Sequence, residues 1–208
     1  MPRRSEVVQG RKAAAPSVFI NCPFDPRYER LFVALISTLT ALGLVPRSVL
    51  QVHGTTDRLR RVYGLIRECE VSVHDLSYVR LSTTRPRVPR FNMPFELGLA
   101  AAAGLASARH RWFVLERQPY RLQVSLSDVN GYDPYIHRGT PAGMIEAIAN
   151  VFSKPGEPGM RLLHDQFAAL ETVARNLKRR ERHSTLFAPR PFRGLVLAGM
   201  RLATRSLV

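Results

Sequence analysis

Short apolar segments that alternate with helical patterns constrain the fold of this chain more than any other feature. Four segments have the length and composition of strands: SVFIN at 17–21, LVPRSVLQV at 44–52, EVSVHDL at 70–76 and RWFVLER at 111–117. Strands that alternate with helices predict an α/β fold, in which an open parallel sheet carries helices on both faces. A further apolar segment, YRLQVSLSD at 120–128, would bring the sheet to about five strands.

Composition divides the chain into three parts. Residues 1–16 are predicted to be a flexible basic leader, which lacks the apolar core of a secretory signal. Residues 17–153 form the predicted α/β domain, whose last helix begins after Thr140 with Pro141 at its first position. Residues 154–208 follow the break KPGEPG and are predicted to be a basic helical extension, with one long helix from about Met160 to Arg182.

Charge and cysteine content restrict the partners and the compartment. The chain has 31 Lys and Arg against 16 Asp and Glu, a net charge of +15, which favours nucleic acid, nucleotides or an anionic membrane face as partners. Its two cysteines make neither a disulfide framework nor a four-ligand metal site, so we expect a reduced, cytoplasmic protein. No run approaches the roughly 18 consecutive apolar residues of a transmembrane segment.

Three polar clusters follow predicted strands or begin a predicted helix. They are NCPFD at 21–25, HDLS at 74–77 and NMPFE at 92–96. In an open parallel sheet, ligands bind in the crevice beyond the carboxyl ends of the strands, at the switch point of the strand order. The three clusters are therefore expected to converge on one site.

Each carboxylate in these clusters has a functional and a structural interpretation. With Asn92 as the N-cap, Glu96 would lie in or near the first helical turn, where the helix dipole would keep it ionised as a nucleophile or as a partner for a cation. Acidic residues are also common there for the dipole alone. Asp75 can orient a ligand or close its strand with an Asx turn, and Asp25 can cap a helix that begins near Pro26.

Other chemistries have weaker support. Only four residues separate Cys22 from Arg27, and two of them are prolines without an N–H, which argues against a phosphatase loop. No GxGxxG or P-loop sequence is present. The six histidines have no metal-like spacing, and Ser125 and Ser127 lack the glycines of a nucleophile elbow. We therefore predict no metal site.

The segments VFINCPFD, HDLS and N-x-PFELGLAAAAG together resemble the nucleoside 2-deoxyribosyltransferase-like and TIR-like N-glycosidases, which are flavodoxin-like α/β domains. The resemblance covers roughly residues 17–150, and the FELG helix is its most specific part. It implies that Glu96 is the catalytic carboxylate and that Asp75 orients the ribose hydroxyls or Glu96. It also implies a substrate-binding set of Asn21, Pro23, Phe24, Asp25, Arg90, Asn92 and Met93.

One departure from this group points to a particular substrate. The sequence RFNMP stands where the transferases have an acidic residue and glycines, and it suits a larger anionic substrate such as NAD or a nucleotide. Arg85, Arg87 and Arg90 are then candidate phosphate ligands, with a solvated basic loop as the alternative. The resemblance implies an N-glycosidase that needs no cofactor, with NAD as a candidate substrate. Such an enzyme would be a gated effector of bacterial antiviral defence or a toxin, acting as a homo-oligomer or within a larger assembly.

Two other functions are compatible with the sequence. The chain can be a non-catalytic nucleotide-sensing or scaffold module, or a nucleic-acid-binding protein in which the α/β domain is only structural. In the extension, ARNLKRRERH can bind nucleic acid, and FRGLVLAGMRLATRSLV can pack on a partner protein or an anionic membrane surface. Alternatively, the extension is a solvated helix followed by a tail that folds back on the core.

Overall fold

The computed structural model describes residues 15–52, 57–78, 85, 91–129, 131–180 and 184–205. Its strands form one five-stranded sheet in the order β2-β1-β3-β4-β5, in which every neighbouring pair is parallel. This is the flavodoxin-like strand order, and it confirms the predicted α/β class. The strands are β1 (Ser17–Asn21), β2 (Val45–Arg47), β3 (Val71–Asp75), β4 (Arg111–Glu116) and β5 (Tyr135–Ile136).

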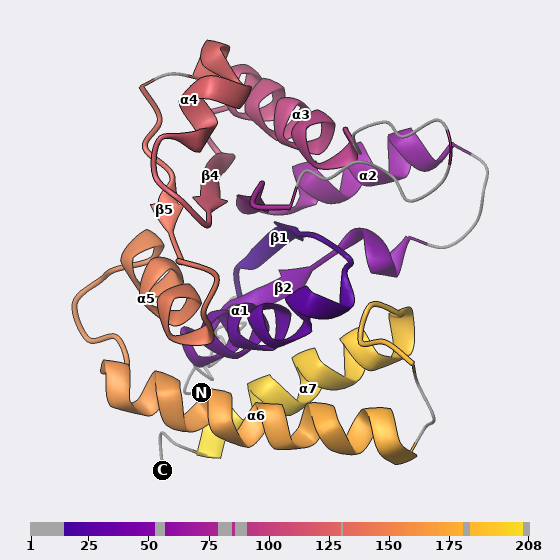
Figure 1. Cartoon of the computed structure of the whole chain (residues 1–208), viewed down its shortest axis with the longest axis vertical. Coiled ribbons are helices and arrows are strands. Elements are labelled where there is room, and N and C mark those ends of the chain that lie inside the picture. The colour runs from indigo at the N-terminus through magenta and orange to yellow at the C-terminus, as the bar shows by residue number, and fades with distance from the viewer. Residues whose placement is uncertain are drawn as a thin grey trace, which may run out of the picture.

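Helices cover both faces of the sheet, as Figure 1 shows. On one face lie α2 (Arg58–Glu68), α3 (Asn92–Ala106) and the short α4 (Arg121–Ser125). On the other lie α1 (Glu29–Ala41) and α5 (Pro141–Val151), and α6 (Met160–Arg180) and α7 (Pro189–Arg205) add an outer layer over α1. Three 3₁₀ turns complete the described elements: η1 (Pro26–Tyr28), η2 (Val49–Gln51) and η3 (Ser127–Val129).

The apolar runs in the sequence are explained by burial from both sides. In β1, Val18 and Ile20 belong to the cluster that α1, α5, α6 and α7 complete, whereas Phe19 belongs to the cluster under α2 and α3. Ten consecutive residues of α1, from Leu31 to Thr40, are buried, because α6 and α7 cover the side of α1 that faces away from the sheet. Helix α1 is therefore buried around its whole circumference over these residues.

The C-terminal extension shares the core of the α/β domain. Phe192 and Leu195 of α7 are fully buried in the same cluster as Phe32. The buried Gln166 of α6 donates from Nε2 to the carbonyl oxygens of Ser37 and Gly199 and to Thr40 Oγ1, at 3.1–3.3 Å. Of the interpretations left open for the extension, the structure shows a chain that folds back on the core. No described helix is long and apolar enough to cross a membrane.

Two predicted strands differ from the structure. Residues 120–128 form α4 and η3 instead of a fifth strand, and Val124, which a strand pattern would bury or pair, is 89% exposed. The fifth strand is instead the two-residue Tyr135–Ile136. The second strand is also shorter than predicted, because Ser48 begins η2 with a capping box that ends the extended backbone.

Candidate active site at the carboxyl edge of the sheet

The switch point of this strand order lies between β1 and β3. These strands are neighbours, yet the chain leaves β1 for α1 on one face and reaches α3 on the other face after β3. The polar residues that end the strands are Asn21 on β1, Asp75 on β3 and Glu116 on β4, and all three are buried. A ligand that follows the general rule for open α/β sheets would bind beside them.

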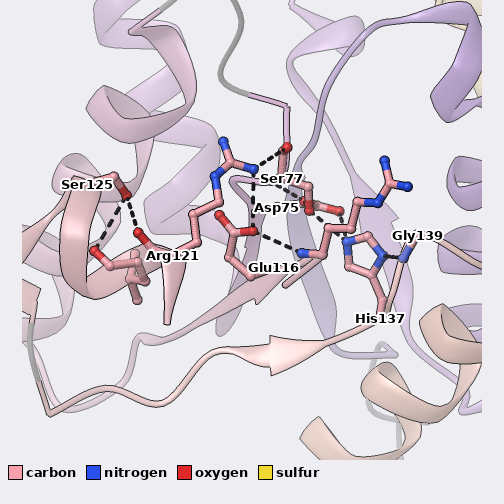
Figure 2. Close-up of polar contacts among 9 residues, drawn as sticks. Asp75, Ser77, Glu116, Arg121, Ser125, His137 and Gly139 are labelled. Carbon is pink, nitrogen blue, oxygen red and sulfur yellow. Dashed lines mark hydrogen bonds and ion pairs between the residues drawn. The ribbon is translucent and has the colours of Figure 1, made fainter. Parts of the chain in front are cut away.

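Asp75 is held by four hydrogen bonds inside the protein. Figure 2 shows its neighbours Ser77 and His137. The Tyr28 hydroxyl donates to Oδ2, and both the backbone N–H and the hydroxyl of Ser77 donate to Oδ1. His137 Nε2 lies 3.1 Å from Oδ2. Burial alone would raise the pKa of Asp75, but hydrogen bonds from His137, Ser77 and Tyr28 outweigh it and lower the pKa below its ordinary value. The Asx turn expected from the sequence is thus part of a larger buried network.

His137 has a defined tautomer in this network. Its Nδ1 accepts a hydrogen bond from the Gly139 N–H at 3.0 Å, so the ring hydrogen is on Nε2, which faces Asp75 and Ser77. This arrangement is not a Ser-His-Asp triad. In a triad the serine and the aspartate contact opposite ring nitrogens, whereas here both contact Nε2 and the serine donates to the aspartate.

Glu116 forms a second buried carboxyl at the same edge, next to the Asp75 network in Figure 2. It accepts from the Arg117 N–H at 2.9 Å, and its Oε2 lies 3.7 Å from Nη1 of Arg121. The same Arg121 nitrogen donates to the Ser77 carbonyl at 2.6 Å and so joins β4 to the end of β3. Burial raises the pKa of Glu116, and the Arg121 charge opposes that rise.

Glu96 differs from both of these carboxyls. Its Oε2 is buried and has no hydrogen-bond partner among the residues that the structure describes. Burial raises the pKa of Glu96 to about 7, although the Arg58 guanidinium acts in the opposite direction. An unpartnered buried carboxyl oxygen is costly, and such groups are concentrated at functional sites.

The sequence-based account of Glu96 is wrong in two respects. Phe91, not Asn92, is the N-cap, and Asn92 is the exposed first residue of α3. Glu96 is therefore the fifth residue of the helix, and no acidic residue lies in the first turn. The dipole does not keep Glu96 ionised as expected, since its effect fades beyond the first turn and burial dominates.

Asn21 connects β1 to β3 and α3. Its Nδ2 lies 3.0 Å from His74 Nδ1 and donates to the Met93 carbonyl at 3.0 Å, so both amide hydrogens are used. The amide group therefore offers a ligand its carbonyl oxygen, an acceptor. The contact with Met93 is made by the backbone, and the Met93 side chain packs with Leu76 and Leu97.

A buried chain of hydrogen bonds holds the Asn21 amide in this orientation. His74 Nε2 lies 2.9 Å from Ser72 Oγ, which lies 3.0 Å from His110 Nε2, and His110 Nδ1 lies 2.9 Å from the Cys69 carbonyl. That carbonyl can only accept, which places a hydrogen on His110 Nδ1. With His110 Nε2 then an acceptor, Ser72 donates to His110, His74 donates to Ser72 and Asn21 donates to His74. Burial, together with His110, lowers the pKa of His74 to about 3, so this ring is neutral at physiological pH.

The loop after β1 contributes one exposed aromatic ring. Phe24 is 40% exposed and stacks on Phe187, whereas the neighbouring Pro23 is buried. Asp25 accepts from the Arg27 N–H at 2.9 Å and caps η1, as its structural interpretation predicted. Arg85 is exposed, and Arg87 and Arg90 lie outside the described residues.

Cys22 shows that the two predicted catalytic carboxyls share one neighbourhood. This thiol is buried, and its pKa is raised by burial and by the charges of both Asp75 and Glu96. A buried thiol with a raised pKa is a poor nucleophile, which agrees with the exclusion of a phosphatase loop. Cys22 thus follows Asn21 in the chain and is within reach of the charges of Asp75 and Glu96, whereas Asp25 caps η1.

Sequence reasoning missed several residues of this edge. Glu116 ends its strand as Asp75 does, so the rule that placed Asp75 could also have identified it. Ser77 belongs to the predicted HDLS cluster and reaches Asp75 locally, two residues along the chain. Tyr28 and Arg121 have no comparable signal, and His137 stands in a loop whose approach to Asp75 only the tertiary structure shows.

The fold and this edge define an α/β protein with a flavodoxin-like parallel sheet and a buried polar site at its switch point. Comparison with protein-family models, with curated proteins and with solved structures finds no match to the chain.

Proposed function

We propose that this protein is an N-glycosidase that cleaves the base–ribose bond of NAD or a related nucleotide, with Glu96 as the reactive carboxyl. One observation carries the proposal. Asp75 and Glu116 are engaged by hydrogen bonds and an arginine, whereas Glu96 has a buried oxygen that no described residue hydrogen-bonds. A carboxyl oxygen left unpaired beside the switch point is available to a substrate.

The proposed chemistry breaks the bond between C1′ of the ribose and the ring nitrogen of the base. The bonding electrons leave with the base, and positive charge develops on the ribosyl group. Ionised Glu96 stabilises that charge or forms a bond to C1′, and water then completes the hydrolysis and releases a proton. Nicotinamide is already cationic in NAD, so it leaves as a neutral molecule without a general acid. Its charge also favours the ionised form of Glu96 in the complex.

The other predicted residues have distinct roles in this proposal. The Asn21 carbonyl oxygen accepts a hydrogen bond from a ribose hydroxyl, and Phe24 flanks the base. Asn92, the exposed first residue of α3, is the proposed phosphate contact. Arg90 stays the candidate that the sequence names for the same role, outside the described residues. Asp75 acts as a positioning residue, because its oxygens are already occupied by Tyr28, Ser77 and His137.

The test is release of the free base, followed by chromatography, from NAD, mononucleotides and nucleosides. The wild-type protein is compared with Glu96→Gln and with Glu146→Gln, a matched change at an exposed carboxyl of α5. Loss of release in Glu96→Gln alone, with an unchanged circular dichroism spectrum, would support the proposal and identify the substrate. Equal release by all three proteins would overturn the role of Glu96.

We further propose that the activity is gated, as the resemblance to effectors of antiviral defence and toxins implies. An enzyme that destroys NAD in the cytoplasm has to be inactive until a partner or self-assembly releases it. The assay is therefore repeated at concentrations that drive assembly and with nucleic acid present. Base release that begins only under those conditions supports gating. No base release under any of them contradicts the proposed N-glycosidase activity.

One observation favours a second candidate, a nucleotide-sensing module without catalysis. With a pKa of about 7, Glu96 is protonated in about half of the molecules at neutral pH and repels an anionic ligand less than a carboxylate would. Calorimetry with NAD separates the two functions. A sensor binds NAD without turnover, and its Glu96→Gln variant binds NAD as tightly as the wild-type protein or more tightly.

A further inference from the structure

Helix α7 presents two chemically different faces. Its inward face is apolar: Phe192, Leu195, Val196 and Gly199 are buried in the core. Its outward face carries four exposed arginines, Arg190, Arg193, Arg201 and Arg205, which we call the α7 arginine stripe. At 3.6 residues per turn, these four positions fall within about one third of the helix circumference. The arginines therefore point to the same side of the molecule.

The charge of the stripe is not compensated within the described part of the chain. The ion pairs of the described residues engage Arg30, Arg47, Arg60, Arg121, Arg138 and Lys178, and none includes a stripe arginine. Residues 182–208 contain five arginines and no acidic residue. On the adjacent α6, Glu171 is already paired with Arg30, which leaves Asp165 as the remaining carboxylate of that helix. Four cations on one face thus favour an anionic partner.

We propose that the α7 arginine stripe binds the phosphodiester backbone of duplex nucleic acid. Arg190 and Arg205 are separated along the helix axis by about 22 Å, at 1.5 Å per residue, which spans about six base-pair steps of a duplex. The helix is held in place by its buried face and by the contact of Gln166 with Gly199, so little ordering is needed on binding. The proposed contacts are to phosphates, which carry no sequence information, so binding is independent of sequence.

Two other anionic partners fit this face less well. An anionic membrane surface binds helices through an exposed apolar face, but the apolar face of α7 is buried in the core, with only Leu197 and Met200 exposed among the arginines. Single-stranded nucleic acid is held largely by aromatic stacking, and the outward face of α7 contains no aromatic residue. The chemistry that remains is electrostatic contact with the phosphates of a duplex.

The experiment measures binding of the full chain to a fluorescent DNA duplex of about two helical turns, by anisotropy, between about 50 and 200 mM salt. If the stripe contacts four phosphates, log K should fall against log salt with a slope of at least about −3.6 in magnitude, or about −0.9 for each phosphate. The double variant Arg193→Gln/Arg201→Gln should reduce the magnitude of the slope by about 1.8 and weaken binding several-fold at the lowest salt.

The matched control is Arg67→Gln/Arg109→Gln, which removes the same charge from two exposed arginines outside α7, one on α2 and one in the turn between α3 and β4. The control should bind the duplex with the wild-type slope, while both variants keep the wild-type melting temperature. Equal loss of binding in both variants would show a general effect of net charge and overturn the stripe. Unchanged binding by the α7 variant would overturn it as well.

Further probes test the choice of partner. An RNA duplex of the same sequence should bind with the same dependence on the stripe, because the phosphates are shared. The proposal would be contradicted if the protein bound the single strand more tightly than either duplex. Tighter binding to vesicles that contain phosphatidylserine than to either duplex would contradict it as well. This inference does not rest on the N-glycosidase activity, so failure of either proposal leaves the other standing.

Discussion

The carboxylate of Asp75 lies 3.1 Å from Nε2 of His137, and neither side chain has any exposed surface. A buried charge of this kind is tolerated only because donors surround it, here from Tyr28, Ser77 and His137. The network joins the ends of β3 and β5 to η1. It therefore makes the carboxyl edge rigid, which a site that must position a small substrate requires.

Asp75→Asn is expected to lower the free energy of unfolding by about 3 kcal/mol or more at pH 7, since an amide cannot accept from all of these donors. Urea denaturation of the variant measures the change. Asp25→Asn serves as the control, because Asp25 is a partly exposed cap for which asparagine is nearly equivalent. Equal stability of the wild-type protein and Asp75→Asn would contradict the network.

The pH dependence of that difference has a definite sign. The pKa of Asp75 is lowered on folding, so the unfolded chain binds the proton more readily than the folded one. The stability from this group is present above its ordinary pKa of 3.8 and is lost as the pH falls below it. The gap between the wild-type protein and Asp75→Asn should therefore narrow below about pH 4. If the difference in stability between the wild-type protein and Asp75→Asn widened in acid, a lowered pKa of Asp75 would be contradicted.

Glu96→Gln is expected to gain stability relative to the wild-type protein as the pH rises. The pKa of Glu96 is about 7 in the folded protein against an ordinary value of 4.5, so wild-type stability falls between these two pH values and is level above them. Glutamine does not titrate, and the difference should shift in its favour by about 3 kcal/mol between pH 4 and pH 8. Thermal or urea unfolding at both pH values measures the shift.

If Glu96 acts as an ionised carboxylate, kcat/KM for base release should rise with pH and level off above about pH 7. Below that value, activity should fall about tenfold for each pH unit, because the protonated form cannot stabilise the ribosyl cation. A profile that instead falls as the pH rises through 7 would make Glu96 a general acid. The control is a substrate without a titratable base, for which the same limb should appear.

Gly199→Ala should destabilise the protein by about 1–3 kcal/mol, because its Cβ would lie 2.4 Å from Thr40 Oγ1 in a packed interface between α7 and α1. Gly64→Ala, a glycine of α2 with nothing within 4 Å of its Cβ position, should stabilise the protein by up to about 1 kcal/mol. Urea unfolding of the two variants, expected to have opposite signs, measures how tightly the extension is packed. A neutral Gly199→Ala would show that α7 is loosely held.

The fold class was predictable because it depends on local patterns. Strands and helices give apolar patterns with different periods, so both can be recognised in the sequence. Because strands and helices alternate along the chain, only a few sheet topologies are compatible with it. The strand predicted at residues 120–128 was wrong for the same reason. Leu122, Val124 and Leu126 alternate as in a strand, but Leu122 packs in the core as part of the short helix α4. The two-residue β5 is too short to give any periodic signal.

The chain's sequence by itself determined the parallel α/β sheet, the clusters at its carboxyl edge and the identity of Glu96 as a candidate carboxyl. Only the tertiary structure decided how each carboxyl is solvated. Asp75 and Glu96 are both acidic, and both charges act on Cys22. Burial with donors lowers the pKa of Asp75, whereas burial without a hydrogen-bond partner among the described residues raises the pKa of Glu96. The Ser77 donor is local in the sequence, but the donors from Tyr28 and His137 reach Asp75 only through long-range packing.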